Sequence, residues 1–392
     1  MQAEIPKAAA PRRLSSVLAG AAALVFVALA AAGLAVPAAE YRFVPGTVAD
    51  PAGAEPVFRT DVVARGEAGL LHAPSIAPTG DGGLLAVWFQ GSEEGAPDVE
   101  IRSARFAGGR WEAPRKVTSG EATGRELGRY VNTVGNAVLV PRPDGELWLV
   151  YVSVSLGGWA TSQLNLKRSH DNGASWSAAE RLVTSPFFNL STLVKTRPVQ
   201  FAGGLAGVPA YHEMAAKFPE LLVLGPDGAL VDKRRLGSGG RIAIQPAIAA
   251  LDAERAVALM RRGRSSAPHL FASHTEDGGA TWSAVRPTGL PNPGGPAGLL
   301  RLDPDTLLLV FGDSARRETN LTLAVSKDGG VSWRRIARIA EMPEDAPGEI
   351  TYPFMTADPS GAIHVVWADK RDLTIRHAMF NRAWLDRQAE LP

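Results

Sequence analysis

Residues 326–333 read Ser-Lys-Asp-Gly-Gly-Val-Ser-Trp, and two other segments of the chain repeat this pattern. Residues 169–176 read Ser-His-Asp-Asn-Gly-Ala-Ser-Trp, and residues 275–282 read Thr-Glu-Asp-Gly-Gly-Ala-Thr-Trp. The second and third aspartates lie 328 − 277 = 51 residues apart, and the first and second lie 277 − 171 = 106 apart. One period followed by about two periods predicts a repeat of about 50 residues.

A second signal has the same period. Turn residues followed by a short apolar run occur six times, with aligned positions near 84, 147, 205, 256, 307 and 363, a mean spacing of (363 − 84)/5, or about 56. Four short strands in such a unit, repeated six times, describe an all-β, six-bladed β-propeller. Apolar patterns of helical period are weak, which argues against a helical solenoid. We expect residues 57–63 to pair with the last blade and close the ring, removing its free edges.

The Ser/Thr-x-Asp-x-Gly-x-x-Trp motif predicts a hairpin. Its hydroxyl and carboxylate bind nearby backbone amides, its glycine supplies a positive φ, and its tryptophan buries a large apolar surface. We therefore interpret the three aspartates as parts of three separate turns, which do not converge on one site. Segments 108–111 and 226–228 resemble degenerate versions of the same hairpin.

The N-terminal region predicts a membrane anchor. An uninterrupted run of apolar or small residues extends from Leu14 to Val36, after Lys7, Arg12 and Arg13. A helix of this length can cross a hydrocarbon core of about 30 Å, and the basic residues before it should stay cytoplasmic. We expect a transmembrane signal-anchor at 14–36, a linker at 37–56, and the propeller at 57–385 on the extracytoplasmic (periplasmic or extracellular) side. A cleaved signal peptide is the alternative.

Composition excludes several kinds of chemistry. The chain has no cysteine, so it has no disulfide, no cysteine-ligated zinc and no thiol nucleophile. The net charge is +1 and no basic run follows the first fourteen residues, so nucleic acid is not an expected partner. The seven histidines are scattered and no Gly-x-Ser-x-Gly is present. We expect no metal and no cofactor.

On these motifs the chain resembles the bacterial Asp-box (BNR repeat) sialidase-like family, the predicted neuraminidases. The resemblance covers about residues 57–385 and includes the phrases Trp88–Asp98 and Pro209–Met214. It implies a carbohydrate substrate and a catalytic aspartate, tyrosine and glutamate, with arginines that hold a substrate carboxylate. A tyrosine nucleophile suits sialic acid, because the carboxylate on the anomeric carbon would repel an anionic nucleophile.

The resemblance carries over to particular residues. The catalytic candidates are Asp98 as acid/base, Tyr352 as nucleophile and Glu213 as the carboxylate that assists it, with Glu349 as the alternative. The substrate-binding candidates are His72, Gln245, Arg261 and Arg316 (or its neighbour Arg317).

Two of these positions depart from the family pattern. His72 stands where family sialidases have an arginine, and histidine lacks the permanent bidentate charge of a guanidinium. Gln245 stands close to the position of the assisting glutamate, and an amide cannot accept a phenolic proton. The sequence therefore leaves three functions open: a sialidase-type exo-glycosidase, a catalytically inert glycan-binding propeller, or a uronate polysaccharide lyase with Tyr352 and His72 as base and acid.

Overall fold

The computed structural model describes residues 12–35, 39–185, 189–214, 216–237, 242–263 and 268–389. The chain divides into two units, Met1–Glu40 and Tyr41–Pro392.

The first unit contains one helix, α1 (Arg12–Ala35), in the region where the anchor is expected. Its side chains are described only for residues 17–28, so the expected span 14–36 lies partly outside the described residues. Within the described part of the chain, no helix is both long enough and apolar enough to cross a membrane.

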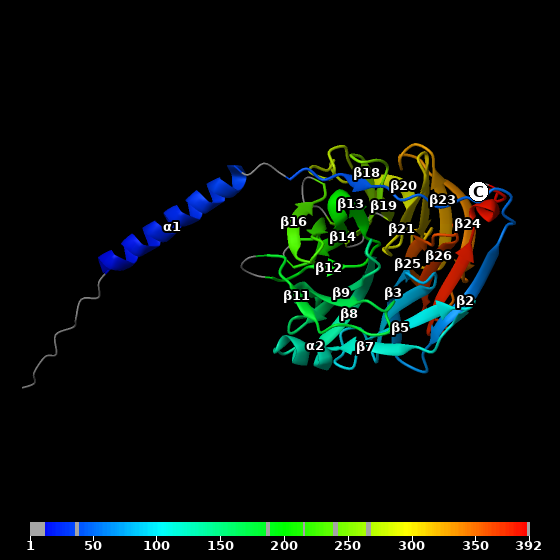
Figure 1. Cartoon of the computed structure of the whole chain (residues 1–392), viewed down its shortest axis with the longest axis horizontal. Helices are drawn as coiled ribbons and strands as arrows, with labels where there is room; N and C mark the ends of the chain where they lie inside the picture. Colours follow the sequence, from blue (N-terminus) through cyan, green and yellow to red (C-terminus); the bar gives the residue numbers. More distant parts are fainter. Residues whose placement is uncertain are drawn as a thin grey trace, which may run out of the picture. The chain divides into compact units, whose positions relative to one another are not determined.

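The second unit is a six-bladed β-propeller, as predicted, with one antiparallel sheet for each blade (Figure 1). Blade one contains β3 (Leu70–Pro78), β4 (Leu84–Gly91), β5 (Glu100–Ala107), β6 (Arg110–Trp111) and β7 (Arg115–Ser119). Blade two contains β8 (Thr133–Pro141), β9 (Leu147–Val154), β10 (Gln163–Ser169) and β11 (Glu180–Leu182). Blade three contains β12 (Leu193–Val194), β13 (Val199–Phe201), β14 (Leu205–His212), β15 (Phe218–Leu224) and β16 (Leu230–Arg235).

Blade four contains β17 (Ala243–Ala250), β18 (Ala256–Arg262), β19 (His269–Thr275) and β20 (Arg286–Pro291). Blade five contains β21 (Gly298–Asp303), β22 (Thr306–Phe311), β23 (Asn320–Ser326) and β24 (Arg334–Glu341). Blade six contains β25 (Ile350–Ala357), β26 (Ile363–Asp369), β27 (Thr374–Phe380) and β2 (Phe58–Arg65). Short helices α2 (Gly120–Leu127), α3 (Arg382–Leu385), η1 (Gly158–Thr161) and η2 (Ala202–Gly204) lie between or after strands.

The six apolar runs found in the sequence are the second strands of the six blades. Five of these strands begin at the aligned positions 84, 147, 205, 256 and 363, and β22 begins one residue before 307. The strand β9 is buried along its whole length. A sheet that is covered on both faces needs such continuous apolar strands, and the stacking of neighbouring blades supplies this cover.

The ring closes through its N-terminal strand. Strand β2 pairs antiparallel with β27, from Phe58 opposite Phe380 to Arg65 opposite Thr374. The expected pairing of residues 57–63 with the last blade is therefore confirmed. The sheet of blade six is built from both ends of the propeller sequence, and this shared sheet closes the ring.

The segment expected to be a linker, 37–56, differs from that expectation from Tyr41 onward. Strand β1 (Phe43–Val44) pairs with β13 of blade three, and the Phe43 ring stacks on Phe201 at 4.6 Å between centroids. Tyr41 and Phe43 are buried. The segment is rich in Ala, Pro and Gly, which is typical of a linker, but burial of these two aromatic side chains fixes it to the propeller.

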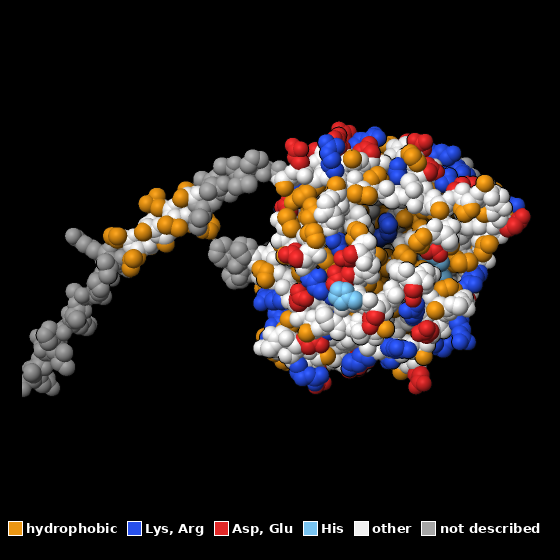
Figure 2. Space-filling model, viewed as in Figure 1, with side chains coloured by type: hydrophobic (Ala, Val, Ile, Leu, Met, Phe, Trp, Pro, Cys, Tyr) orange, Lys and Arg blue, Asp and Glu red, His pale blue; other side chains and the backbone are white. Residues whose placement is uncertain are grey.

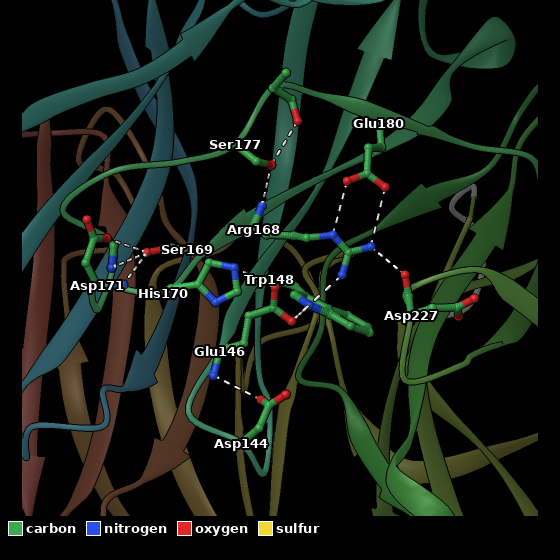
Figure 3. Close-up of polar contacts among 12 residues, drawn as sticks. Asp144, Glu146, Trp148, Arg168, Ser169, His170, Asp171, Ser177, Glu180 and Asp227 are labelled. Atoms are coloured by element: carbon green, nitrogen blue, oxygen red, sulfur yellow. Dashed lines mark hydrogen bonds and ion pairs between the residues drawn. The ribbon is translucent and has the colours of Figure 1, made fainter.

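The three Asp-boxes, at 169–176, 275–282 and 326–333, are the turns between third and fourth strands of blades two, four and five. In blade two, the Ser169 hydroxyl donates to Asp171 Oδ1 at 2.8 Å and accepts from the Gly173 amide at 2.8 Å (Figure 3). The Ser175 amide donates to the same carboxylate at 2.9 Å. The boxes therefore stabilise turns at the outer part of separate blades, as predicted.

The same turn region also joins blades. Arg168 binds both carboxylate oxygens of Glu180 in its own blade and donates to the Asp227 carbonyl of blade three (Figure 3). Trp148 donates to Glu146 at 2.6 Å beside it.

Candidate functional site

Three inner strands carry the same unusual backbone feature, a non-glycine residue with positive φ followed by proline. These residues are Ala73, Gln245 and Tyr352, with φ of 48°, 55° and 58°. Each lies in a β-bulge, where the register between the first and second strands shifts. A positive φ costs a bulky residue about 1–3 kcal/mol, and bulges redirect side chains. Blades one, four and six therefore share the same β-bulge, with a positive-φ residue before proline, at the hub of the propeller.

The bulge in blade four places Gln245 in a chain of hydrogen bonds that crosses three blades. Arg261 Nε, near the end of β18, donates to Gln245 Oε1 at 2.5 Å. Gln245 Nε2 and Asn136 Nδ2 of blade two both donate to the Tyr211 hydroxyl oxygen at 3.1 Å. Burial raises the pKa of Tyr211, which therefore stays a neutral phenol.

The bulge in blade six places the Tyr352 ring against the His72 ring of blade one, with the two ring centroids 4.1 Å apart. Burial raises the pKa of Tyr352, whereas the positive charge of Arg261 and a hydrogen bond with Gln245 oppose the rise. Burial and nearby cations, Lys370 first, hold the pKa of His72 well below its ordinary value. His72 is therefore neutral at physiological pH and does not replace the permanent charge of an arginine.

Lys195 of blade three lies beneath this aromatic pair. It is fully buried, its ammonium lies 5.5 Å from the centre of the Tyr352 ring, and it donates to the Pro74 carbonyl at 2.8 Å. Burial lowers its pKa to about 7. A lysine of this kind changes charge near neutral pH, which an exposed lysine does not.

Glu318 adds a carboxyl group that titrates in the same range. Burial and the nearby Glu349 carboxylate raise the pKa of Glu318 to about 7, against the opposing charges of Arg261 and Lys370. Its charge is also one of the influences that raise the pKa of Tyr352. Among the described residues no hydrogen bond or ion pair engages the Glu318 side chain. Glu349 is instead paired with Lys370 at 2.6 Å.

Glu94 approaches the cluster from the loop between β4 and β5. Its side chain is exposed, yet surrounding protein removes enough water to raise its pKa. The charge of Lys370 and a hydrogen bond with Trp159 oppose that rise. The charge of Glu213 also acts on Glu94. Glu213 itself pairs with Lys217 at 3.1 Å, and its backbone amide donates to Ser191.

Asp98 and Arg316 hold different positions. The two carboxylate oxygens of Asp98 accept from the Ser92 hydroxyl at 2.9 Å and the Ser92 amide at 3.0 Å. Arg316 is exposed, and its amide donates to Ser314. In the described part of the chain, no hydrogen bond or ion pair joins either side chain to the cluster. Arg317 likewise serves its own loop, by donating to the Ala346 and Gly348 carbonyls at 2.9 Å.

The structure thus brings His72, Gln245, Arg261 and Tyr352 together, with Glu213 at the edge. The sequence interpretation missed Glu318, Lys370, Lys195 and Tyr211 as members of the cluster. Two of the missed residues lie in the segments that follow second strands: Lys370 comes directly after β26, and Glu318 lies in the loop between β22 and β23. Because the ends of all second strands reach the same end of the hub, the charged residues in the loops after them were the available signal.

The cluster can support proton transfer and covalent chemistry. It has a phenol, a carboxyl group with a pKa of about 7, and a guanidinium that favours developing negative charge. Within the described residues, no group of three or more His, Asp or Glu side chains could hold a metal ion.

Comparisons with known proteins agree with the propeller fold. A model of the BNR repeat-like domain matches residues 82–365. No curated protein matches the sequence.

Several solved structures have a similar fold. A protein of unknown function from Dyadobacter fermentans is 14% identical with a TM-score of 0.67, covering 88% of this chain and 100% of that one. The intramolecular trans-sialidase from Ruminococcus gnavus is 13% identical with a TM-score of 0.66, covering 84% and 98%. An α-L-arabinanase from Penicillium chrysogenum is 13% identical with a TM-score of 0.63, covering 86% and 100%. At these identities the likeness concerns the fold.

Proposed function

The chain belongs to the BNR repeat-like, sialidase-like family, and on that basis we propose that it is an exo-glycosidase of the sialidase type acting on an extracytoplasmic glycan. The observation that carries the proposal is the strained Tyr352 beside Arg261 and the carboxyl group of Glu318. Buried phenols, titrating carboxyls and strained backbone are features that gather at catalytic sites. The sialidase and arabinanase neighbours support a glycoside hydrolase, although they show only the fold.

In the proposed mechanism, Tyr352 Oη attacks the anomeric carbon of the sugar while Glu318 takes the phenolic proton. A phenol has an ordinary pKa near 10, so it needs such a base. Gln245 cannot accept a proton, and it instead orients the phenol through its hydrogen bond. Arg261 stabilises negative charge that develops on the phenol oxygen as its proton leaves.

The leaving group needs an acid, and we assign this role to Glu94. Its raised pKa keeps a larger fraction protonated than an ordinary glutamate, and its exposure leaves it open to substrate. Asp98, the acid suggested by family resemblance, is held by Ser92 in a turn. Water then attacks the anomeric carbon of the glycosyl-tyrosine and Glu94 takes the proton from that water, while the bond to Tyr352 breaks and Glu318 returns the proton to the phenol oxygen.

Turnover of fluorogenic aryl glycosides, including sialosides, tests this proposal. We expect Tyr352→Phe to abolish turnover, because it removes the nucleophile while the ring still packs on His72. Glu94→Gln should slow the hydrolysis of substrates with poor leaving groups by about 10²–10⁴-fold. Asp98→Asn is the matched control and should change turnover by less than about threefold. Full loss in Asp98→Asn with full activity in Glu94→Gln would return the acid role to Asp98.

A second function remains open on one specific observation. Gln245 is an amide and His72 is neutral, so neither of these two positions carries the charge that a sialidase has there. Arg261, which donates to Gln245, is then the guanidinium of the cluster that could hold a ligand. An inert glycan-binding propeller needs no base for Tyr352. Tight binding on a glycan array, with no release from any aryl glycoside, would support this alternative. An ultraviolet-absorbing unsaturated product would instead indicate a uronate lyase that uses Tyr352 and His72.

We also propose that the propeller is held at the membrane on the extracytoplasmic side. The support is the apolar sequence 14–36 behind Lys7, Arg12 and Arg13. Because the chain has no cysteine, one introduced cysteine reports topology cleanly. In intact cells, a membrane-impermeant maleimide should label Glu112→Cys but not Gln2→Cys, and lysis should expose both. The reverse pattern would place the propeller in the cytoplasm.

A further inference from the structure

The central channel of the propeller has a second opening, at the end opposite the candidate site, which we call the second mouth. A cavity of about 470 Å³ is lined by the C-terminal ends of the inner strands of all six blades, together with residues 44–48. The candidate site uses the opposite ends: on β25, Tyr352 belongs to the candidate site, whereas Thr356 and Ala357 line this cavity. Four or five residues of extended chain separate the two by about 13–17 Å. The cavity is therefore a distinct place in the molecule.

The inner strand of blade three is interrupted between these two mouths. Strands β12 and β13 are separated by Lys195-Thr196-Arg197-Pro198. Lys195 donates to the Pro74 carbonyl of blade one, and the Thr196 hydroxyl donates to the Pro246 carbonyl of blade four. This segment therefore fills the channel and fastens neighbouring blades through two of its side chains.

Its third polar side chain, Arg197, is different. It faces the second mouth, and among the described residues it makes no side-chain hydrogen bond and no ion pair. Burial lowers the pKa of its guanidinium, which nevertheless stays charged. Arg197 is half-buried, and a partly dehydrated cation without a partner is costly in the folded state. An arginine kept in this condition is pre-organised for an anion.

The rest of the cavity has the same electrostatic sign. Arg142 and Arg301 also line it, and each retains a buried nitrogen without a hydrogen-bond partner in the described part of the chain. The one carboxylate in the lining, Asp358, is already engaged by His364 at 3.2 Å and by Ser360 at 2.6 Å. In the described part of the chain, no ion pair joins the Asp358 carboxylate to Arg197.

The walls restrict the kind of anion. They include the buried apolar side chains Ile76, Leu139, Ile248 and Phe354. Figure 1 shows residues 41–57 crossing the face that is turned toward the viewer, and in the same view Figure 2 shows hydrophobic side chains around a recess near the middle of this face. A bare inorganic ion would leave these walls uncovered, and the volume is within the range of small-molecule pockets.

We propose that this second mouth binds a small organic acid, whose carboxylate pairs with the Arg197 guanidinium and whose apolar body packs on the walls. Guanidinium and carboxylate match as bidentate partners, and desolvation strengthens the pair. The site does not depend on the proposed glycosidase activity.

Binding of benzoate to the full chain tests the proposal, with neutral benzamide as the isostere and inorganic phosphate as the bare oxyanion. Isothermal titration at fixed ionic strength should show benzoate binding at least about tenfold tighter than benzamide, because a hydrogen-bonded charge is worth that much or more. Arg197→Met should remove this preference. Arg197→Lys, which keeps the charge but loses the fork, should keep only part of it.

Two control variants separate the second mouth from other cationic surfaces. Arg261→Met at the candidate site and Arg286→Met on exposed strand β20 should both keep the benzoate preference. Equal binding of benzoate and benzamide, a preference that survives Arg197→Met, or binding of phosphate alone would each overturn the proposal. Unfolding curves of every variant show whether a loss of binding reflects a loss of structure.

Discussion

The pKa values of carboxyl groups are shifted in opposite directions in the Asp-box turns and at the hub. In the turn of blade two, hydrogen bonds from Ser175 and Ser169 lower the pKa of Asp171 to about 2 (Figure 3). At the hub, burial raises the pKa of Glu318 to about 7 and lowers that of Lys195 to about 7. Hydrogen bonds to a carboxylate favour its ionised form, whereas burial without such bonds favours its protonated form. The contrast separates the motif that identifies the architecture from the residues that we expect to do chemistry.

The largest expected effect divides these two regions within blade five. Glu318→Gln should lower kcat/KM by about 10²–10⁴-fold, because it removes the base for Tyr352, and should leave the unfolding midpoint nearly unchanged. Asp328→Asn, in the Asp-box of the same blade, should do the reverse. Kinetics and thermal unfolding of both purified variants check the pair. If Asp328→Asn lost activity without losing stability, the division would be wrong.

Sequence reasoning reached the architecture because each repeat carries its own local signals. The turns before Leu84, Leu147, Leu205, Ala256 and Ile363 mark strand starts without knowledge of the rest of the chain. Closure by β2 also followed, because an open ring would leave unpaired edges.

The candidate site was harder, because its members are joined only by closure of the ring. Glu318 and Tyr352 belong to different blades, and burial created by their neighbours is what raises the pKa of Glu318. No local pattern reports that burial. Asp98 was chosen from family resemblance, and sequence alone does not reveal that Ser92 occupies its carboxylate. The positive φ of Gln245 is also a consequence of the folded hub.

The next largest effect concerns Lys195, whose folded pKa of about 7 lies below the ordinary 10.5. Between these values the unfolded state binds more protons, so this residue makes the free energy of unfolding rise with pH. In Lys195→Met that contribution disappears. We expect the stability difference between wild type and Lys195→Met to shift in favour of wild type by about 2–4 kcal/mol from pH 7 to pH 10.

Urea unfolding of both proteins at several pH values measures this shift. Lys233→Met, which changes a partly exposed lysine of β16, is the matched control and should show a much smaller pH dependence. A difference between wild type and Lys195→Met that stays constant across this range would mean that Lys195 is charged in the folded protein.

A smaller effect should appear in the pH dependence of turnover. Glu318 must be deprotonated to accept the phenolic proton, so kcat/KM should fall about tenfold for each pH unit below about 7. The residual activity of Glu318→Gln should lack this acidic limb. Steady-state kinetics between pH 5 and pH 8, a range that spans the pKa, provide the measurement. An acidic limb that survives in the variant would assign it to another group.

The smallest effect tests the turns themselves. The folded pKa of Asp171, about 2, lies below its ordinary 3.8, so its ionised form stabilises the protein above the unfolded pKa and loses that effect as pH falls through the folded pKa. Asp171 is exposed, and solvent screening reduces the contribution to about 1 kcal/mol. Asp171→Asn should therefore be less stable than wild type by this amount at pH 6, and the two should approach each other near pH 2. Because the hydroxyl of Ser169 also binds the Gly173 amide, Ser169→Ala should destabilise the turn at both pH values. Equal pH dependence in both variants would mean that the turn relies on its shape and not on the charge of its aspartate.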